Sequence, residues 1–139
     1  MVTLQNMKIL ITGVQGQLGF EFSKVMGLTG AKIYLGARRP LEPNFFGHPI
    51  IRFDLNEPEA LRTEILRLKP HIIINAAAYT AVEKAETEQE LAYRVNAEAP
   101  LAMAEALQEI GGAFIHFCAY TCADIAFMAA CAKEASERK

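Results

Sequence analysis

The amino-acid sequence predicts an α/β protein with a doubly wound parallel sheet of about five strands. Short apolar runs alternate with longer helical segments along the 139 residues, which is the pattern of βαβ units. A glycine-rich stretch lies directly between the first apolar run and the first helical segment. The hydrophobic fraction of 52% is sufficient to bury a core, so we expect one folded domain.

The first half of the chain contains three expected strands, at residues 8–12, 31–36 and 50–53. The helix after the glycines places four apolar side chains on one face: Leu18, Phe22, Val25 and Met26. A second helix is expected to begin at Asn56, whose side chain can cap it, and to stop at Pro70.

The second half continues the same alternation. Residues 72–74 are a continuous apolar run, as expected for a central parallel strand that is covered on both faces. A long helix follows, with Pro100 as an expected kink and a glycine pair at its end. Residues 113–117 are the last expected strand. The alanine-rich residues 118–139 can form an amphipathic helix, with Ile125, Met128 and Ala132 on one side.

The turn from Thr12 to Gly19 carries the strongest chemical signal. Gly13 permits a tight turn, Gly16 lets the backbone approach a phosphate, and Gly19 lets the helix pack closely on the sheet. The helix N-terminus offers N–H groups and a partial positive charge to a pyrophosphate. We therefore expect a Rossmann-type domain whose dinucleotide contacts are Gly13, Gln15, Gly16, Gln17, Leu18 and Gly19. The alternative is a purely structural turn.

Two further positions bear on the choice of cofactor. Arg38 and Arg39 follow the second strand, where a site for NAD often carries an acidic residue. A guanidinium group could pair with a 2′-phosphate, so NADPH is favoured and NADH is the alternative; two solvated loop arginines are the other interpretation. Asp54, followed by Leu55, either binds the adenine amine or serves only as a turn residue.

Small side chains follow the fourth strand, where the crevice of an open α/β sheet should lie. They let a ligand approach the backbone, so we expect cofactor contacts here, with tight packing as the alternative. The residues concerned are Ala76, Ala77, Ala78 and Tyr79.

The run from Asn75 to Glu86, together with Val95-Asn96-Ala97 and the glycine turn, resembles the dTDP-4-dehydrorhamnose reductase family of extended short-chain dehydrogenases. The resemblance covers about residues 7–116. It implies NADPH-dependent reduction of dTDP-4-dehydro-L-rhamnose to dTDP-L-rhamnose for surface polysaccharide. It also implies cofactor contacts near Tyr79, a sugar site at Thr80 and Val82, and a capacity to form a homodimer.

The sequence departs from that family after the fifth strand. Members use a Tyr followed four residues later by a Lys, but none of the four tyrosines here has that partner. We therefore assign no catalytic residue. Residues 1–117 are interpreted as a partial, truncated NAD(P)-binding domain and residues 118–139 as a divergent tail. Three hypotheses stay open: an inactive part of a reductase, a binding or regulatory module, and the remnant of a truncated or frameshifted gene.

The composition limits the kinds of partner that we expect the protein to bind. The net charge of −2, without a basic run, argues against nucleic acid, and no segment approaches the ~20 apolar residues of a membrane span. The first residues lack the pattern of a secretory signal, and the three cysteines are odd in number. We therefore expect a cytoplasmic protein with reduced thiols. The cysteines have no Cys-x-x-Cys spacing, so we expect no metal site.

Overall fold

A computed structural model describes residues 4–14, 16–40, 42–76 and 88–117 of the chain. They form a six-stranded sheet with the order β3-β4-β2-β1-β5-β6. The strands are β1 (Lys8–Thr12), β2 (Lys32–Ala37), β3 (Asn44–Phe45), β4 (His48–Arg52), β5 (Ile72–Asn75) and β6 (Ala113–His116). All neighbouring strands run parallel except β3 and β4. The predicted parallel sheet and its five strands are confirmed.

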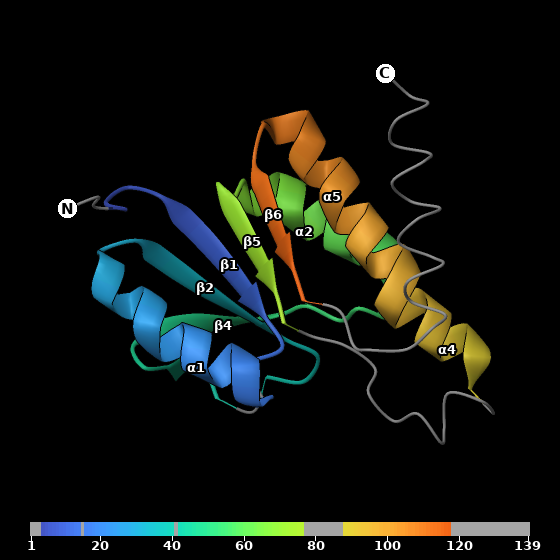
Figure 1. Ribbon diagram of the computed structural model, residues 1–139, viewed down its shortest axis with the longest axis horizontal. Helices are drawn as coiled ribbons and strands as arrows, with labels where there is room; N and C mark the ends of the chain where they lie inside the picture. The colour runs from blue at the N-terminus through green and yellow to red at the C-terminus, as the bar shows by residue number, and fades with distance from the viewer. Residues whose placement is uncertain (1–3, 15, 41, 77–87, 118–139) are drawn as a thin grey trace.

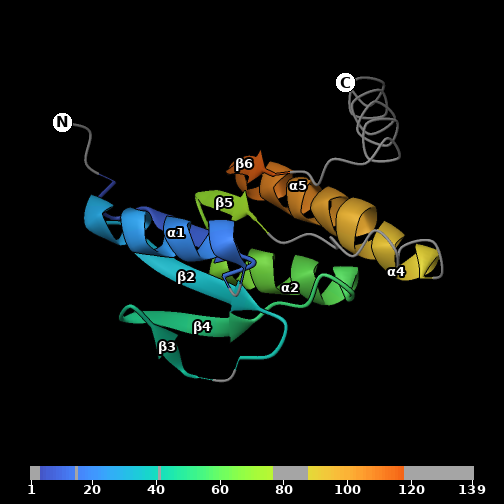
Figure 2. The ribbon, with the colours of Figure 1, turned by 60° about the horizontal axis from the view of Figure 1, so that its bottom comes forward.

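The short strand β3 is the element that the sequence did not reveal. It pairs antiparallel with β4 through a two-residue turn, in which Phe46 (φ 50°) and Gly47 (φ 77°) both adopt left-handed conformations. Positive φ at both central residues characterises the hairpin turn that matches the twist of two antiparallel strands. A two-residue strand shows no periodicity, and Phe is an unusual residue for such a turn. Figure 2 shows β3 beyond β4 at one edge of the sheet, with β6 at the other.

Helices cover both faces of the sheet, so the doubly wound prediction is also confirmed (Figure 1). Helix α1 (Gln17–Met26) lies on one face and continues into the 3₁₀ turn η1 (Gly27–Thr29). On the other face, α2 (Pro58–Leu68) packs against α5 (Ala99–Ile110). Helix α4 (Gln89–Tyr93) leads into α5 through one π-helical turn, η2 (Arg94–Glu98).

Alternate residues of the central strand enter two separate cores. Ile9 and Ile11 of β1 pack under α1, whereas Leu10 packs with Ile65 and Met103 of the two helices on the opposite face. All five side chains are fully buried. Side chains alternate between the faces of a strand, so an entirely apolar strand must be covered on both sides.

The sequence predicted a kink at Pro100 and a helix cap at Asn56. Pro100 lies in the first turn of α5, and the expected irregularity takes the form of the π turn just before it. Proline lacks an N–H and crowds the preceding turn, which explains an altered hydrogen-bond pattern there. The prediction that Asn56 caps α2 is wrong: α2 begins at Pro58 after Glu57. Asn56 instead accepts a hydrogen bond (2.9 Å) from Arg94 of the π turn.

The core on the α2 and α5 face yields a stability prediction. Ile65→Ala should lower the free energy of unfolding by about 2–5 kcal/mol, because the side chain is fully buried and the truncation leaves a cavity. Leu28→Ala is the matched control, since Leu28 is 88% exposed, and it should change stability by less than about 0.5 kcal/mol. Urea denaturation followed by circular dichroism measures both. Equal losses in the two variants would contradict this core.

Candidate functional site

The glycine turn lies at the centre of the carboxyl edge of the sheet. It joins the end of β1 to α1, and β1 has β2 on one side and β5 on the other. The chain passes from β1 to β2 in one direction and later returns to β5 on the opposite side. In open α/β sheets, ligands bind in the crevice outside the carboxyl ends of the strands at such a reversal.

Two glycines of the turn are required by the protein itself. Gly13 has φ 73°, a left-handed conformation that side chains other than glycine rarely adopt. Gly19 is buried against the turn: a Cβ added there would overlap the carbonyl group of Gly13 and stand 2.9 Å from Cα of Val14. These two positions therefore let α1 start directly on top of the end of β1.

Gly16 differs from both. Its backbone is extended (φ −88°, ψ 166°), and its N–H donates to the Gly13 carbonyl oxygen at 3.0 Å. A Cβ added at Gly16 would meet only that oxygen, at 3.4 Å, which is an ordinary van der Waals contact. The residue is exposed. Nothing in the described fold requires a glycine here. The close approach of a ligand would explain why this position lacks a side chain.

The N-terminus of α1 is arranged to receive an anion. Gly16 occupies the N-cap position, where no side chain from the described part of the chain caps the helix, and the first turn holds no acidic residue. Gln17 and Leu18, which open the helix, are exposed. The first N–H groups of a helix lack acceptors within it and carry the positive end of the helix dipole. Gln15 lies outside the described residues.

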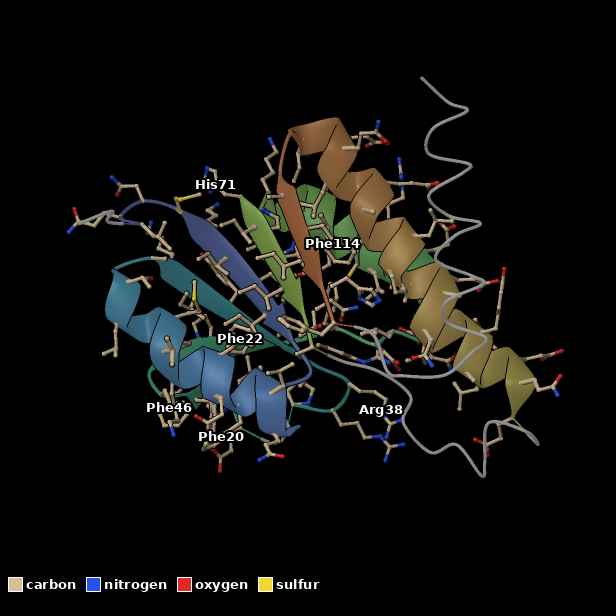
Figure 3. All side chains as sticks on the ribbon, viewed as in Figure 1. Phe20, Phe22, Arg38, Phe46, His71 and Phe114 are labelled. Atoms are coloured by element: carbon tan, nitrogen blue, oxygen red, sulfur yellow. The ribbon has the colours of Figure 1, made fainter. Side chains whose placement is uncertain are left out.

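Arg38 and Arg39 lie at the same edge of the sheet. They directly follow β2, which pairs with β1 so that Gly36 stands opposite Thr12, the last residue before the glycine turn. Both arginines are exposed, and Figure 3 labels Arg38 beyond the ends of the strands. Two guanidinium groups therefore stand one strand away from the turn.

Asp54 is engaged in a turn. One carboxylate oxygen, Oδ1, accepts the N–H of Asn56 (3.0 Å), and the Asp54 carbonyl accepts the N–H of Glu57 (3.0 Å). This is the Asx turn that leads into α2. The other oxygen, Oδ2, is 4.0 Å from Arg52 and keeps acceptor capacity. Leu55 buries its side chain in the core, so only its backbone is suited to contact a ligand.

The stretch after β5 is described only at its start. The N–H of Ala76 donates to the carbonyl oxygen of Thr12 (3.3 Å), which holds the end of β5 beside the glycine turn. The other candidates from this stretch lie outside the described residues: Ala77, Ala78, Tyr79, Thr80 and Val82.

Sequence reasoning missed a buried polar network under the site. Thr12 donates its hydroxyl to Asn75 Oδ1 (2.5 Å), and Asn75 Nδ2 lies 3.0 Å from His116 Nδ1. These residues end β1, β5 and β6, and the first two are fully buried. A hydrogen-bonded network in a low-dielectric interior is costly to break, so it fixes the relative positions of three strand ends. A polar residue closing each apolar run was the available signal.

No helix in the described part of the chain is long and apolar enough to cross a membrane. No three His, Cys, Asp or Glu side chains within the described ranges are gathered as a metal site would need.

A glycine turn that brings an uncapped helix N-terminus to the carboxyl edge of a doubly wound parallel sheet defines the Rossmann-type class. The chain belongs to the RmlD substrate binding domain family, whose model matches residues 7–131.

Named relatives agree with this family. The dTDP-4-dehydrorhamnose reductase of Burkholderia thailandensis is 36% identical over 111 residues, which are 80% of this chain and 33% of the relative. A crystal structure of a hypothetical dTDP-4-dehydrorhamnose reductase from Sulfolobus tokodaii has a TM-score of 0.69 at 35% identity, covering 79% of this chain and 38% of that one.

The reductase from Bacillus anthracis, solved in complex with NADP, has a TM-score of 0.65 at 28% identity, covering 81% of this chain and 36% of that one. The chain spans about a third of the length of the curated relatives it matches.

Replacement by alanine should affect stability differently at Gly19, which the packing requires, and at Gly16, which has room for a Cβ. Gly19→Ala should lower the free energy of unfolding by about 1–3 kcal/mol, because the new methyl group collides with backbone that cannot move aside. Gly16→Ala should cost less than about 1 kcal/mol, the size of a helix-cap effect. Chemical denaturation of both variants tests the difference. A Gly19→Ala protein as stable as Gly16→Ala would show that the close contact between α1 and β1 is absent.

Proposed function

We propose that this chain is the NADP(H)-binding part of a dTDP-4-dehydrorhamnose reductase. The observation that carries the proposal is Gly16: the fold leaves room for a Cβ there, yet the position is glycine, exposed, and at the uncapped start of α1. A pyrophosphate lying against the helix N-terminus supplies the missing reason, because a side chain at this point would keep it from the N–H groups.

The preference for the phosphorylated cofactor rests on Arg38 and Arg39. They are exposed, follow the strand next to the turn, and offer planar donor groups to a 2′-phosphate. The Bacillus anthracis relative was solved with NADP, which agrees with this choice. NADH is the weaker candidate. Asp54 Oδ2 and the backbone of Leu55 would meet the adenine, and Ala76–Tyr79 would line the nicotinamide half.

For a complete reductase that contains this part, the proposed reaction is reduction of the 4-keto group of dTDP-4-dehydro-L-rhamnose. NADPH supplies the hydride when bound, and an acid must protonate the developing alkoxide. The sequence contains no Tyr followed four residues later by Lys, and the chain spans about a third of its relatives. We therefore propose cofactor binding without turnover by this chain. Thr80 and Val82 would face the sugar only when the remaining parts of a reductase are present.

A second candidate function is a non-catalytic NAD(P)-binding or regulatory module. The missing Tyr-Lys pair favours it, and it shares the same cofactor site. For either function we propose a cytoplasmic protein whose ligand is a dinucleotide rather than nucleic acid, with the capacity to form a homodimer. The net charge of −2 and the absence of a basic run support the choice of ligand.

Gly16→Val tests the phosphate site. The branched side chain should occupy the place of the pyrophosphate and abolish saturable NADPH binding. An extended backbone suits valine, so the circular dichroism spectrum should stay unchanged. Fluorescence titration of NADPH measures the affinity. Thr63→Val, which places the same side chain at an exposed position of α2, is the control and should bind like the wild type. Wild-type affinity in Gly16→Val would remove the proposed function.

The double variant Arg38→Ala/Arg39→Ala tests the 2′-phosphate assignment. Losing charge-assisted hydrogen bonds, worth about 1.5–3 kcal/mol each, should weaken NADPH binding by about 10-fold or more and leave NADH nearly unchanged. Arg67→Ala is the matched control, because Arg67 is exposed in the last turn of α2 and pairs with Glu64. The ratio of the two dissociation constants is the readout. A ratio that stays at its wild-type value would defeat the assignment.

A further inference from the structure

One side chain ties the turn between β4 and α2 to a distant helical segment. Arg94 is the first residue of the π turn η2, and its Nη1 donates to Oδ1 of Asn56 at 2.9 Å. Both residues are half-buried, so water competes only partly for this charge-assisted hydrogen bond. Figure 2 shows α4, which leads into the π turn, beyond the carboxyl ends of the strands on the side where α2 begins. Arg94 therefore reaches the edge of the sheet where the candidate site lies.

The ion pair that Arg94 also makes is weak by comparison. Its Nη2 lies 3.9 Å from Oε2 of Glu90, whose side chain is 95% exposed, and solvated pairs of this kind contribute little to stability. The bond to Asn56 also replaces a helix cap. Asparagine is a favoured capping residue, yet no side chain of the described residues caps α2 at Glu57. The fold directs Asn56 toward Arg94 rather than toward the helix, which indicates that this bond has a role of its own.

Asn56 in turn holds Asp54. The N–H of Asn56 donates to Asp54 Oδ1 (3.0 Å) and closes the Asx turn, while Oδ2 keeps acceptor capacity. The Asp54 side chain is only 14% exposed, which limits the competition from water at that oxygen. Two hydrogen bonds in series therefore connect the guanidinium group of Arg94 to the orientation of one carboxylate.

We propose that Arg94 is a positioning residue that makes the site selective for adenine as the base of its dinucleotide. Through Asn56 it orders the Asx turn, and the turn holds Asp54 Oδ2 ready to accept the exocyclic amine of the base. The inference rests on the proposed function, since that function places the adenine at Asp54. A base with a carbonyl oxygen in place of the amine has no proton to donate, so an ordered carboxylate disfavours it.

The alternative is that Arg94 only fastens helical segments together, and the same face of the sheet offers a matched comparison. Arg62 of α2 pairs with Glu109 in the last turn of α5, so it also joins two helical segments through an arginine. Glu109 lies at the end of α5 that is remote from η2. Loss of the Arg62 side chain should therefore loosen the helices without reaching the turn at Asp54.

Fluorescence titration of the full chain with two reduced dinucleotides tests the proposal: NADPH and its hypoxanthine analogue, in which a carbonyl replaces the adenine amine. Arg94→Met keeps a long, helix-compatible side chain without a donor. It should weaken NADPH binding by about 3–10-fold and leave the analogue unchanged. Asn56→Ala should do the same, and the double variant should lose no more, because both changes break one bond. Arg94→Lys retains a cationic donor and should restore most of the preference for NADPH.

Arg62→Met is the control and should keep the wild-type ratio of the two dissociation constants. Equal weakening of both dinucleotides in Arg94→Met would overturn the proposal, as would additive losses in the double variant. Asn56→Ala removes the acceptor of the same bond and keeps the test valid if Arg94→Met fails to fold. A wild-type chain that binds neither dinucleotide would remove the proposed function together with this inference. Wild-type binding whose ratio is unchanged in Arg94→Met would remove the inference alone.

Discussion

The contact between α1 and the end of β1 is the constraint on which the rest of the structure depends. Gly13 turns the chain in a left-handed conformation, and Gly19 lets the helix rest against the carbonyl of Gly13. This contact sets the helix N-terminus at the carboxyl edge, beside the strand where the sheet reverses its order. It also fixes the side of α1 that looks toward β6. The same contact therefore sets both the packing of α1 on the sheet and the position of the candidate anion site.

Polar groups beneath the site complement that contact. Thr12, Asn75 and His116 join the ends of three parallel strands, whose interiors are held only by apolar packing and ladder hydrogen bonds. Apolar side chains fix distance poorly, whereas a buried hydrogen bond specifies direction as well. The ends of these three strands are therefore more sharply positioned than the exposed side chains of Arg38 and Arg39, which follow β2 at the same edge of the sheet.

The fold also explains how a chain that spans about a third of the length of its relatives can form a domain with its own core. Its central strands are buried on both faces by its own helices, and the short β3 protects the outer side of β4. The opposite edge differs: β6 keeps an apolar surface beside α1. The candidate anion site and the uncovered apolar surface thus lie in different parts of the fold, the first at the carboxyl edge and the second beside β6.

The sequence by itself determined the strands, the helices on both faces and the glycine turn, because these follow from local periodicity and backbone sterics. It did not reveal β3, the displacement of Asn56 from the helix cap to Arg94, or the link from Thr12 to His116. Those depend on partners 38 to 63 residues apart or on a turn with no sequence pattern. The sequence already suggested different roles for Gly13, Gly16 and Gly19. Only the tertiary structure gave the physical reason, because the left-handed φ of Gly13, the close contact at Gly19 and the open space at Gly16 depend on how α1 sits on the end of β1.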